Sequence, residues 1–188
     1  RTALAVLSIA AGVFAIGAIF GMIDQLVNGM DNAHQEVRPA HINIILRDFA
    51  GQDTVDQLKQ LPGVVDIDPI NQLSVRYKIE ENGEWNLGTL VVRPDYRQQR
   101  FDLMELTGGD WPGSEDSSAA SLAVERLSGQ YFGLELADEV VFEVGDTESR
   151  IPISGQIRHP FVQPPPFGGQ AHFFTDPAGL ARFGIPEG

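Results

Sequence analysis

The chain begins with a continuous run of apolar residues and turns polar at Asp24. Between Thr2 and Ile23 the sequence has no charged residue, and Thr2 and Ser8 carry the only polar side chains. A helix of about 20 apolar residues spans the ~30 Å hydrocarbon core of a bilayer. The run is longer than the apolar region of a signal peptide, and it lacks both the polar face of a soluble core helix and the charged face of an interfacial helix. It predicts a transmembrane helix over residues 1–23.

Small residues recur along this predicted helix. Gly12, Gly17 and Gly21 stand among several alanines. Small residues let a neighbouring membrane helix approach closely, whereas an anchor alone in lipid gains nothing from them. We therefore expect Gly12, Gly17 and Gly21 to pack against further membrane helices, which would follow Gly188 in a longer gene product.

The helical pattern continues beyond the apolar run. Apolar residues recur at spacings of three and four from Leu26 to Val37, and polar residues occupy the other positions. Pro39 then disfavours further helix. Residues 24–39 are thus predicted to form an amphipathic helical stalk.

Beyond the stalk, short apolar runs separated by turn residues are typical of a sheet with few helices. Asn82-Gly83 is a hairpin signal, and Asp176-Pro177 is a helix-start signal. The expected strands cover residues 41–49, 64–79 with a break near Pro69, 85–92, 139–144, 150–157 and 171–175. The expected helices are a short one that Asp53 or Thr54 caps and Pro62-Gly63 ends, then 121–132 and 177–183. Residues 93–113 are expected to be irregular. This order of elements predicts an α+β fold that starts with a β-α-β-β unit.

The net charge of the chain limits the classes of partner that it can bind. The net charge is −13, with 26 acidic and 13 basic residues, and Arg1 is the only charge before Asp24. A chain this acidic is a poor binder of nucleic acid and of anionic lipid surfaces. Arg1 places the start of the helix on the cytoplasmic side and the acidic portion outside, by the positive-inside rule. The absence of cysteine excludes disulfides and thiol chemistry.

No pattern of catalytic or metal-binding residues emerges. None of the four histidines lies three or four positions from another, and the sequence has no HExxH, GxSxG or phosphate-loop motif. Asp66 and Asp68 would share one face of a strand and could face a cation, but a solvated strand face is favoured because no third carboxylate is near in sequence. We predict no catalytic, cofactor or metal site, and no ATP hydrolysis by this chain.

One loop has an unusual composition. Residues 158–170 (RHPFVQPPPFGGQ) combine three consecutive prolines with Phe161, Val162 and Phe167. Two interpretations stay open. The aromatic side chains pack into the core, which is favoured because apolar side chains usually do so, or the loop contacts a partner or a membrane surface. Phe161, Val162 and Phe167 are the candidate contact residues of the second interpretation.

Several segments together resemble a known family. Residues 1–17 (RTALAVLSIAAGVFAIG) resemble the first membrane helix of MacB-like and FtsX-like permease subunits of ABC transporters. Later segments are similar to that family in the same order: LPGV at 61–64, PDY at 94–96, LTGGDWP at 106–112, AVER at 123–126 and ISGQI at 153–157. The chain departs from the family where Leu136-Ala137-Asp138-Glu139 replaces a Gly-Asp turn.

This resemblance implies an architecture. The extracytoplasmic domain would have two lobes. Residues 40–100 and 160–188 would form a βαβ-rich, ferredoxin-like main lobe, and residues 101–159 a smaller α/β lobe inserted in it.

The resemblance also implies a role and partners. The domain would be non-catalytic and lie on the extracytoplasmic side of a bacterial cell membrane. It would transmit ATP-driven motion to export a substrate or to act on an extracytoplasmic protein partner. The implied partners are a cytoplasmic ATPase subunit, which hydrolyses the ATP, and a second permease subunit in a homodimer. No cofactor and no nucleic acid are implied.

Two other classes of function remain. A single-span membrane sensor or ligand-binding domain predicts a lined ligand pocket and a cytoplasmic signalling domain before Arg1. A membrane-anchored hydrolase is the weaker alternative, because no nucleophile, acid pair or metal set can be assembled from the sequence.

Overall fold

The computed structural model describes residues 2–46, 52–113 and 122–185. The chain divides into two compact units, residues 1–39 and 40–188. The first is a single helix and the second, here called the domain, is built on a sheet. The predicted α+β class is confirmed at this level.

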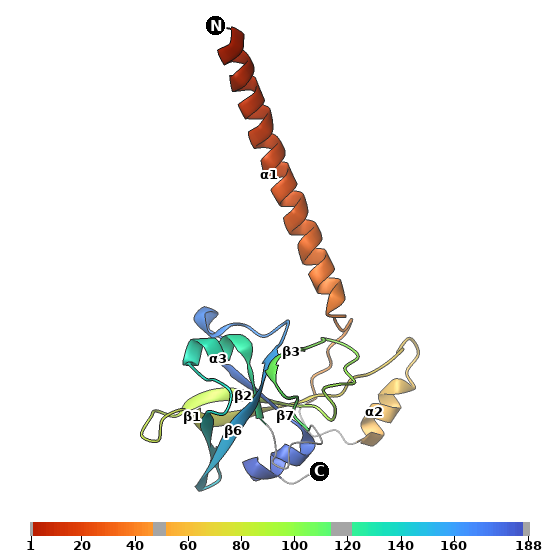
Figure 1. Ribbon diagram of the computed structural model, residues 1–188. Helices are drawn as coiled ribbons and strands as arrows, with labels where there is room; N and C mark the ends of the chain where they lie inside the picture. Colours follow the sequence, from red (N-terminus) through yellow and green to blue (C-terminus); the bar gives the residue numbers. More distant parts are fainter. Residues whose placement is uncertain (1, 47–51, 114–121, 186–188) are drawn as a thin grey trace. The chain divides into compact units, whose positions relative to one another are not determined.

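Helix α1 runs without interruption from Thr2 to Glu36 (Figure 1). Its length and composition suffice to cross a membrane, and none of its residues is buried. The predicted apolar run and the predicted amphipathic stalk are therefore one continuous helix, about 50 Å long at ~1.5 Å per residue. The helix stops where Arg38, at φ 47°, precedes Pro39, because a residue before proline avoids the α conformation.

The domain contains a seven-stranded sheet that closes on itself, counted over the described residues. Its strands are β1 (Asn71–Lys78), β2 (Asn86–Val92), β3 (Glu105–Gly109), β4 (Leu122–Glu125), β5 (Glu139–Val144), β6 (Thr147–Arg158) and β7 (Ala171–Thr175). The order is β3-β6-β4-β7-β2-β1-β5, and β5 pairs again with β6. The 12-residue strand β6 makes this closure possible. Its first half pairs with β5, and its second half pairs with β4 on one side and β3 on the other.

Closure gives each strand an inside and an outside. Leu90 and Val92 of β2 point into the larger buried cluster with Phe173 of β7, whereas Val91 and Phe174 belong to a second cluster. This alternation is the period-2 pattern of a strand. The second cluster lies under residues 93–111, which contribute Tyr96, Met104, Leu106 and Trp111. Both faces of β2 and β7 are thus covered.

Several predicted elements are confirmed. The hairpin turn at Asn82-Gly83 joins β1 to β2, and the predicted strands at 85–92, 139–144, 150–157 and 171–175 correspond to β2, β5, β6 and β7. Helix α2 (Gln52–Lys59) lies where the short helix was predicted. Residues 177–183 are helical but form the 3-10 helix η2 (Pro177–Phe183).

The prediction of a strand at 41–49 is wrong for its described part. Residues 41–46 form no strand, and Ile42, Ile44 and Ile45 are 78%, 62% and 92% exposed. Residues 47–49 lie outside the described residues. The predicted strand at 64–79 likewise begins only at Asn71. Isoleucine favours strands, but a strand also needs a neighbour to accept its hydrogen bonds, and the described sheet offers residues 41–46 none.

Two other predictions need correction. Residues 121–132 are not one helix: β4 occupies 122–125, and α3 (Arg126–Phe132) begins at 126. Leu122, Ala123 and Val124 are fully buried between β6 and β7, so strand pairing on both sides overrides their helical spacing. Residues 93–113 are not wholly irregular, since they include β3.

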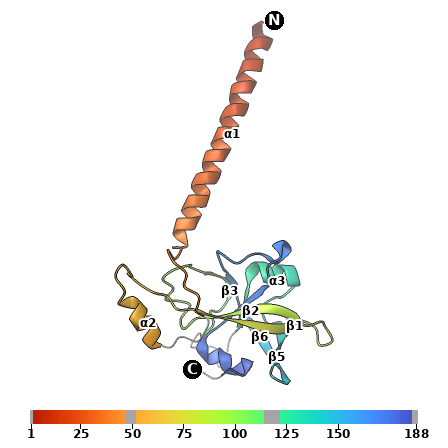
Figure 2. The same cartoon turned by 180° about the vertical axis from the view of Figure 1, so that it is seen from behind.

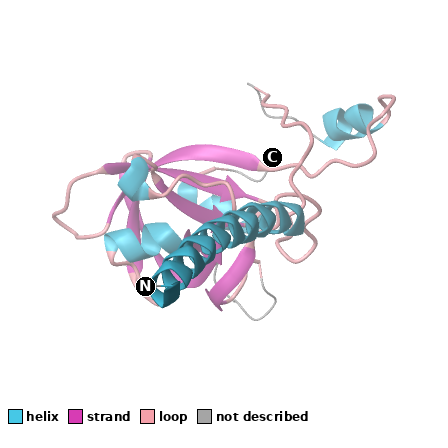
Figure 3. Cartoon of the chain, turned by 90° about the horizontal axis from the view of Figure 1, so that it is seen from above, coloured by secondary structure: helices cyan, strands magenta, loops and turns pink. Residues whose placement is uncertain are grey.

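The two-lobed arrangement is not confirmed. Strands from 40–100 with 160–188 and strands from 101–159 join in the same closed sheet, and α2 stands away from it in every view (Figures 1, 2 and 3). A ferredoxin-like lobe would need α2 packed against strands on either side of it. The division into a main lobe and an inserted lobe stays a prediction.

Closure of the sheet depends on a close approach at Gly155 of β6. A β-carbon there would lie 2.1 Å from the carbonyl oxygen of Asp110. We predict that Gly155→Ala lowers the free energy of unfolding by about 1–3 kcal/mol, the usual cost of overpacking. Gly108→Ala in the neighbouring strand β3 is the matched control, because its β-carbon makes only ordinary contacts, at 3.6 Å or more. Urea unfolding of both variants measures the difference, and equal losses would contradict the explanation.

Candidate functional site: a buried arginine network and an exposed aromatic loop

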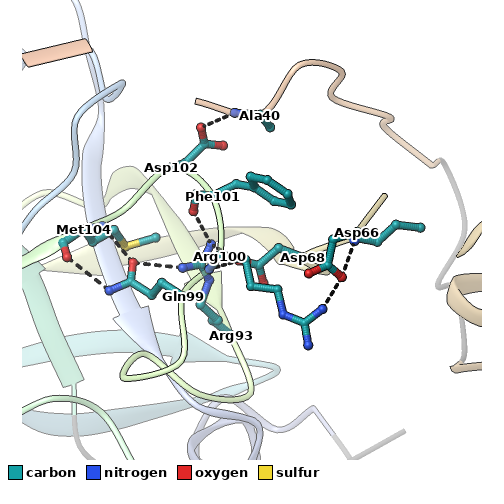
Figure 4. Close-up of polar contacts among 10 residues, drawn as sticks. Ala40, Asp66, Asp68, Arg93, Gln99, Arg100, Phe101, Asp102 and Met104 are labelled. Atoms are coloured by element: carbon teal, nitrogen blue, oxygen red, sulfur yellow. Dashed lines mark hydrogen bonds and ion pairs between the residues drawn. The ribbon is translucent and has the colours of Figure 1, made fainter. Parts of the chain in front are cut away.

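A buried arginine organises the polar interior of the domain. Arg93 directly follows β2, and its side chain is 3% exposed. Its guanidinium forms an ion pair with Asp68 at 3.3 Å and donates a hydrogen bond to the side-chain carbonyl of Gln99 at 2.9 Å (Figure 4). Nε is buried without a hydrogen-bond partner. A buried charge is tolerated only when it is paired, so Arg93 requires Asp68 and Gln99 to stay in place.

Gln99 extends this network to the segment that covers the outer face of the sheet. Its side-chain oxygen also accepts from the backbone N–H of Met104 at 2.7 Å, and its amide donates to the Met104 carbonyl at 3.1 Å. Arg93 also reaches the carbonyl of Phe101 at 3.5 Å. One arginine therefore fixes the path of residues 99–104 over the sheet.

The network includes the first residue of the domain. The backbone N–H of Ala40 donates to Asp102 at 3.1 Å (Figure 4). Asp102 has φ 50°, a left-handed conformation that aspartate adopts more readily than most residues. The segment that Arg93 holds thus also holds the start of the domain.

The two carboxylates singled out from the sequence are ion-pair partners. Asp68 accepts from the backbone N–H of Arg100 as well as pairing with Arg93, and Asp66 pairs with the exposed Arg100 side chain. Within the described part of the chain, no group of three or more histidine and acidic residues could hold a metal ion. The ion pairs and hydrogen bonds of Asp66 and Asp68 therefore attach residues 66–68 to residues 93–104.

Sequence reasoning did not single out Arg93, Gln99 or Asp102. Arginine is usually exposed, and nothing around position 93 marks it as buried. The one available signal was the position of Arg93 directly after the apolar strand 86–92.

Two histidines lie near this network without joining it. His159 stacks on Phe174, with ring centroids 6.2 Å apart, and its Nδ1 accepts from the backbone N–H of Phe161. Burial lowers the pKa of His159 to about 4, with His172 and Arg93 adding to the effect and Asp102 opposing it. Burial also lowers the pKa of His172. His159 is therefore neutral at pH 7.

The candidate contact residues of the proline-rich loop are largely exposed. Phe161 is 49% exposed and Phe167 is 75% exposed, whereas Val162 is half-buried. The favoured interpretation, in which the aromatic side chains pack into the core, is wrong for both phenylalanines. Pro165 is buried in their place and anchors the 3-10 helix η1 (Pro165–Phe167). Contact with a partner stays a prediction.

The candidate helix-packing residues lie along α1. A β-carbon at Gly12, Gly17 or Gly21 would meet no atom within 4 Å. Their role in packing against other membrane helices stays a prediction.

A surface hollow of about 280 Å³ lies at the ends of the two hairpins and is lined by Trp85, Glu143, Asp146 and Glu148 among others. The Trp85 ring in this hollow already makes cation–π contacts with two basic side chains of the domain. Arg76 and Lys78 lie 5.5 Å and 4.7 Å from the centre of the Trp85 ring, and they pair with Glu143 and Glu148. These contacts join the β1–β2 hairpin to the β5–β6 hairpin. They leave little for a ligand to bind.

Comparison with solved structures finds three chains of similar structure, each below 25% identity and below a TM-score of 0.5. The periplasmic region of MacB from Actinobacillus actinomycetemcomitans has a TM-score of 0.45 and 11% identity over 74% of this chain. The extracellular domain of the ABC-type transporter YknZ from Gram-positive bacteria has 0.46 and 15% over 71%. A domain described as part of a permease protein from Porphyromonas gingivalis has 0.41 and 12% over 64%.

This chain covers 58%, 66% and 54% of those three chains, respectively. At such identities and TM-scores, the similarity by itself does not establish a shared activity. No family model and no curated protein matches the sequence.

The buried Arg93–Asp68 ion pair predicts that substitutions of Arg93 and Arg100 lower the free energy of unfolding by unequal amounts. Arg93→Met leaves Asp68 unpaired in a largely buried position, which costs about 3–5 kcal/mol of unfolding free energy. Arg100→Met removes an exposed partner of Asp66 and costs about 1 kcal/mol or less. Urea unfolding measures both, and Arg93→Met combined with Asp68→Asn should recover part of the loss. Equal effects at the two positions would contradict the assignment of Arg93 as the organising residue.

His159 makes stability depend on pH. Because the folded-state pKa of about 4 lies below the ordinary value near 6.5, the unfolded chain binds the proton more tightly. The stability contributed by neutral His159 is complete above about pH 6.5 and is lost as the pH falls toward 4, by roughly 2–3 kcal/mol. His159→Gln should flatten this part of the stability curve measured by urea unfolding, whereas His41→Gln, at an exposed position, should not. An unchanged curve for His159→Gln would refute the prediction.

Proposed function

We propose that this chain is the first membrane helix and the extracytoplasmic domain of an ABC transporter permease subunit. It transmits ATP-driven motion of the membrane helices to the outer side of a bacterial cell membrane. The motion serves to export a substrate or to act on an extracytoplasmic protein. The resemblance of residues 1–17 and of the later segments to MacB-like and FtsX-like permeases supports this class.

The observation that carries the mechanical part of the proposal is the continuity of α1. The apolar run ends at Ile23, but the helix continues to Glu36, about 20 Å further at ~1.5 Å per residue. A continuous helix resists bending, so a displacement within the membrane reaches its far end, whereas an unstructured linker would absorb it.

The connection between helix and domain is short. Three residues, Val37, Arg38 and Pro39, separate the end of α1 from Ala40, and the proline ring restricts the backbone of one of them. Ala40 is held by Asp102, and Phe101, next to Asp102, is held by Arg93. Force applied at Ala40 would thus act on the buried network rather than on a loose loop.

The energy for this motion comes from another subunit. The resemblance to MacB-like and FtsX-like permeases implies that a cytoplasmic ATPase subunit hydrolyses the ATP. A second permease subunit forms a homodimer with this one, and Gly12, Gly17 and Gly21 pack against further membrane helices.

The stalk offers a matched pair of variants at one position. Gly29 lies in the stalk part of α1 with no atom within 4 Å of a β-carbon placed there. Gly29→Pro breaks the helix at a cost of about 3 kcal/mol, whereas Gly29→Ala strengthens it by about 1 kcal/mol. In the complete permease with its ATPase, we expect Gly29→Pro to retain ATP hydrolysis and to lose the movement of the domain.

Spin labels on Asn82→Cys in the two permease subunits report this movement. Asn82 is an exposed turn residue and this chain has no other cysteine. The distance between labels should change on ATP binding in the parent and in Gly29→Ala, and should stay constant in Gly29→Pro. A normal change in Gly29→Pro would rule out transmission through the stalk. A gene product with a signalling domain before Arg1 and no ATPase partner would instead indicate the alternative function, a single-span membrane sensor or ligand-binding domain.

A further inference from the structure

The proline-rich loop, residues 158–170, is stiff in its middle. Pro164, Pro165 and Pro166 restrict its backbone, and the Gln163 side-chain amide donates to the Phe167 carbonyl. Three consecutive prolines and this internal hydrogen bond let the middle of the loop move as one piece. Its position on the domain therefore depends on how the two ends of the loop are held.

A histidine side chain holds the first end of the loop. His159, which directly follows β6, accepts at Nδ1 from the backbone N–H of Phe161 at 3.1 Å. Its ring stacks on Phe174, with centroids 6.2 Å apart and 13° between the ring planes. A backbone N–H only donates, so Nδ1 carries no proton and the single ring proton is on Nε2. This hydrogen bond therefore requires the neutral form of His159.

A second histidine holds the other end with the opposite hydrogen-bond polarity. Nδ1 of His172, the second residue of β7, lies 2.9 Å from the carbonyl oxygen of Gln170. A carbonyl only accepts, so Nδ1 of His172 is the donor. A second proton on this ring goes to Nε2 and leaves the hydrogen bond in place. Acid thus breaks the hydrogen bond at the first end of the loop and keeps the one at the second.

The charged groups around the two rings come from several segments of the domain. His172 of β7 and Arg93 after β2 disfavour a positive charge on His159, and Asp102 favours one. Glu125, at the end of β4, favours a charge on His172. Burial outweighs these favourable charges and lowers the pKa of both histidines. A second proton on His159 is therefore unfavourable while the ring is covered and becomes favourable when the ring reaches water.

We propose that protonation of His159 opens the proline-rich loop. The new N–H at Nδ1 then faces the N–H of Phe161, and two donors cannot share a hydrogen bond. The charged ring leaves Phe174 for water, and the stiff middle of the loop moves away with it, while the sheet keeps its fold. The loop is closed at neutral pH and opens in acid. The proposal involves the domain alone and does not depend on the proposed function.

The sign of the pH dependence follows from the two states of the ring. The pKa of His159 is about 4 in the closed loop and near 6.5 in water. The closed loop is therefore favoured in full above about pH 6.5 and loses this advantage as the pH falls toward 4. Between pH 7 and pH 4 the ratio of open to closed loops rises by up to about 100-fold.

Distances between spin labels test the proposal with the full chain in phosphatidylcholine nanodiscs. One label is on Phe167→Cys in the loop, and the other is on Asn82→Cys in the β1–β2 turn, both at exposed positions. Dilution with unlabelled chain limits the signal to pairs within one molecule. The distance distribution should be narrow at pH 7 and at least twice as wide at pH 4. A control pair on Asn82→Cys and Gln130→Cys of α3 should be unchanged, because the sheet stays folded.

Two histidine variants separate the titration of His159 from other effects of acid. In His159→Asn the side-chain carbonyl can still accept an N–H two residues later but does not titrate, so the loop distance should stay narrow at pH 4. His41→Asn, at an exposed position, is the matched control and should broaden as the parent does. A narrow parent distribution at pH 4, or equal broadening in His159→Asn, would overturn the proposal. Broadening of the control pair together with the loop pair would also overturn it, because the whole domain would then be unfolding.

Discussion

Strand β6 forms backbone hydrogen bonds with β5 over its first half and with β3 and β4 over its second half. These pairings close the sheet, and closure decides which side chains face the interior. Pro152, which has no N–H to donate, lies where β6 leaves β5. Gly155 lies where the chain at Asp110 comes closest. The core, the outer cluster and the path of residues 93–111 all follow from this one strand having more than one partner.

The Arg93 network attaches to the domain those segments that belong to no strand. Residues 66–68, 99–104 and Ala40 have few regular backbone hydrogen bonds, and Arg93, Gln99 and Asp102 supply side-chain partners instead. Such a network is specific because removing one member leaves a buried charge or donor unpaired. In a permease it would join the membrane helix to the rigid sheet.

The surface of the chain combines two opposite tendencies. An excess of carboxylates keeps most of the domain in water, whereas α1 and the proline-rich loop, residues 158–170, expose apolar side chains.

Local patterns in the sequence predicted the elements whose stability is local. Helix α1 needs no partner to satisfy its backbone, so its apolar run and its continuation were readable directly, as were the Asn82-Gly83 turn and the alternating strand β2. Residues 41–46 and 122–125 show where local sequence patterns fail to predict the secondary structure. Isoleucine-rich residues 41–46 lack a strand beside them, whereas 122–125, which are helical in spacing, lie between β6 and β7. The sequence by itself determined the membrane helix, the charge and the α+β class. Only the tertiary structure decided the sheet closure, the buried Arg93 and the exposed Phe167, because each depends on contacts between residues far apart in the chain.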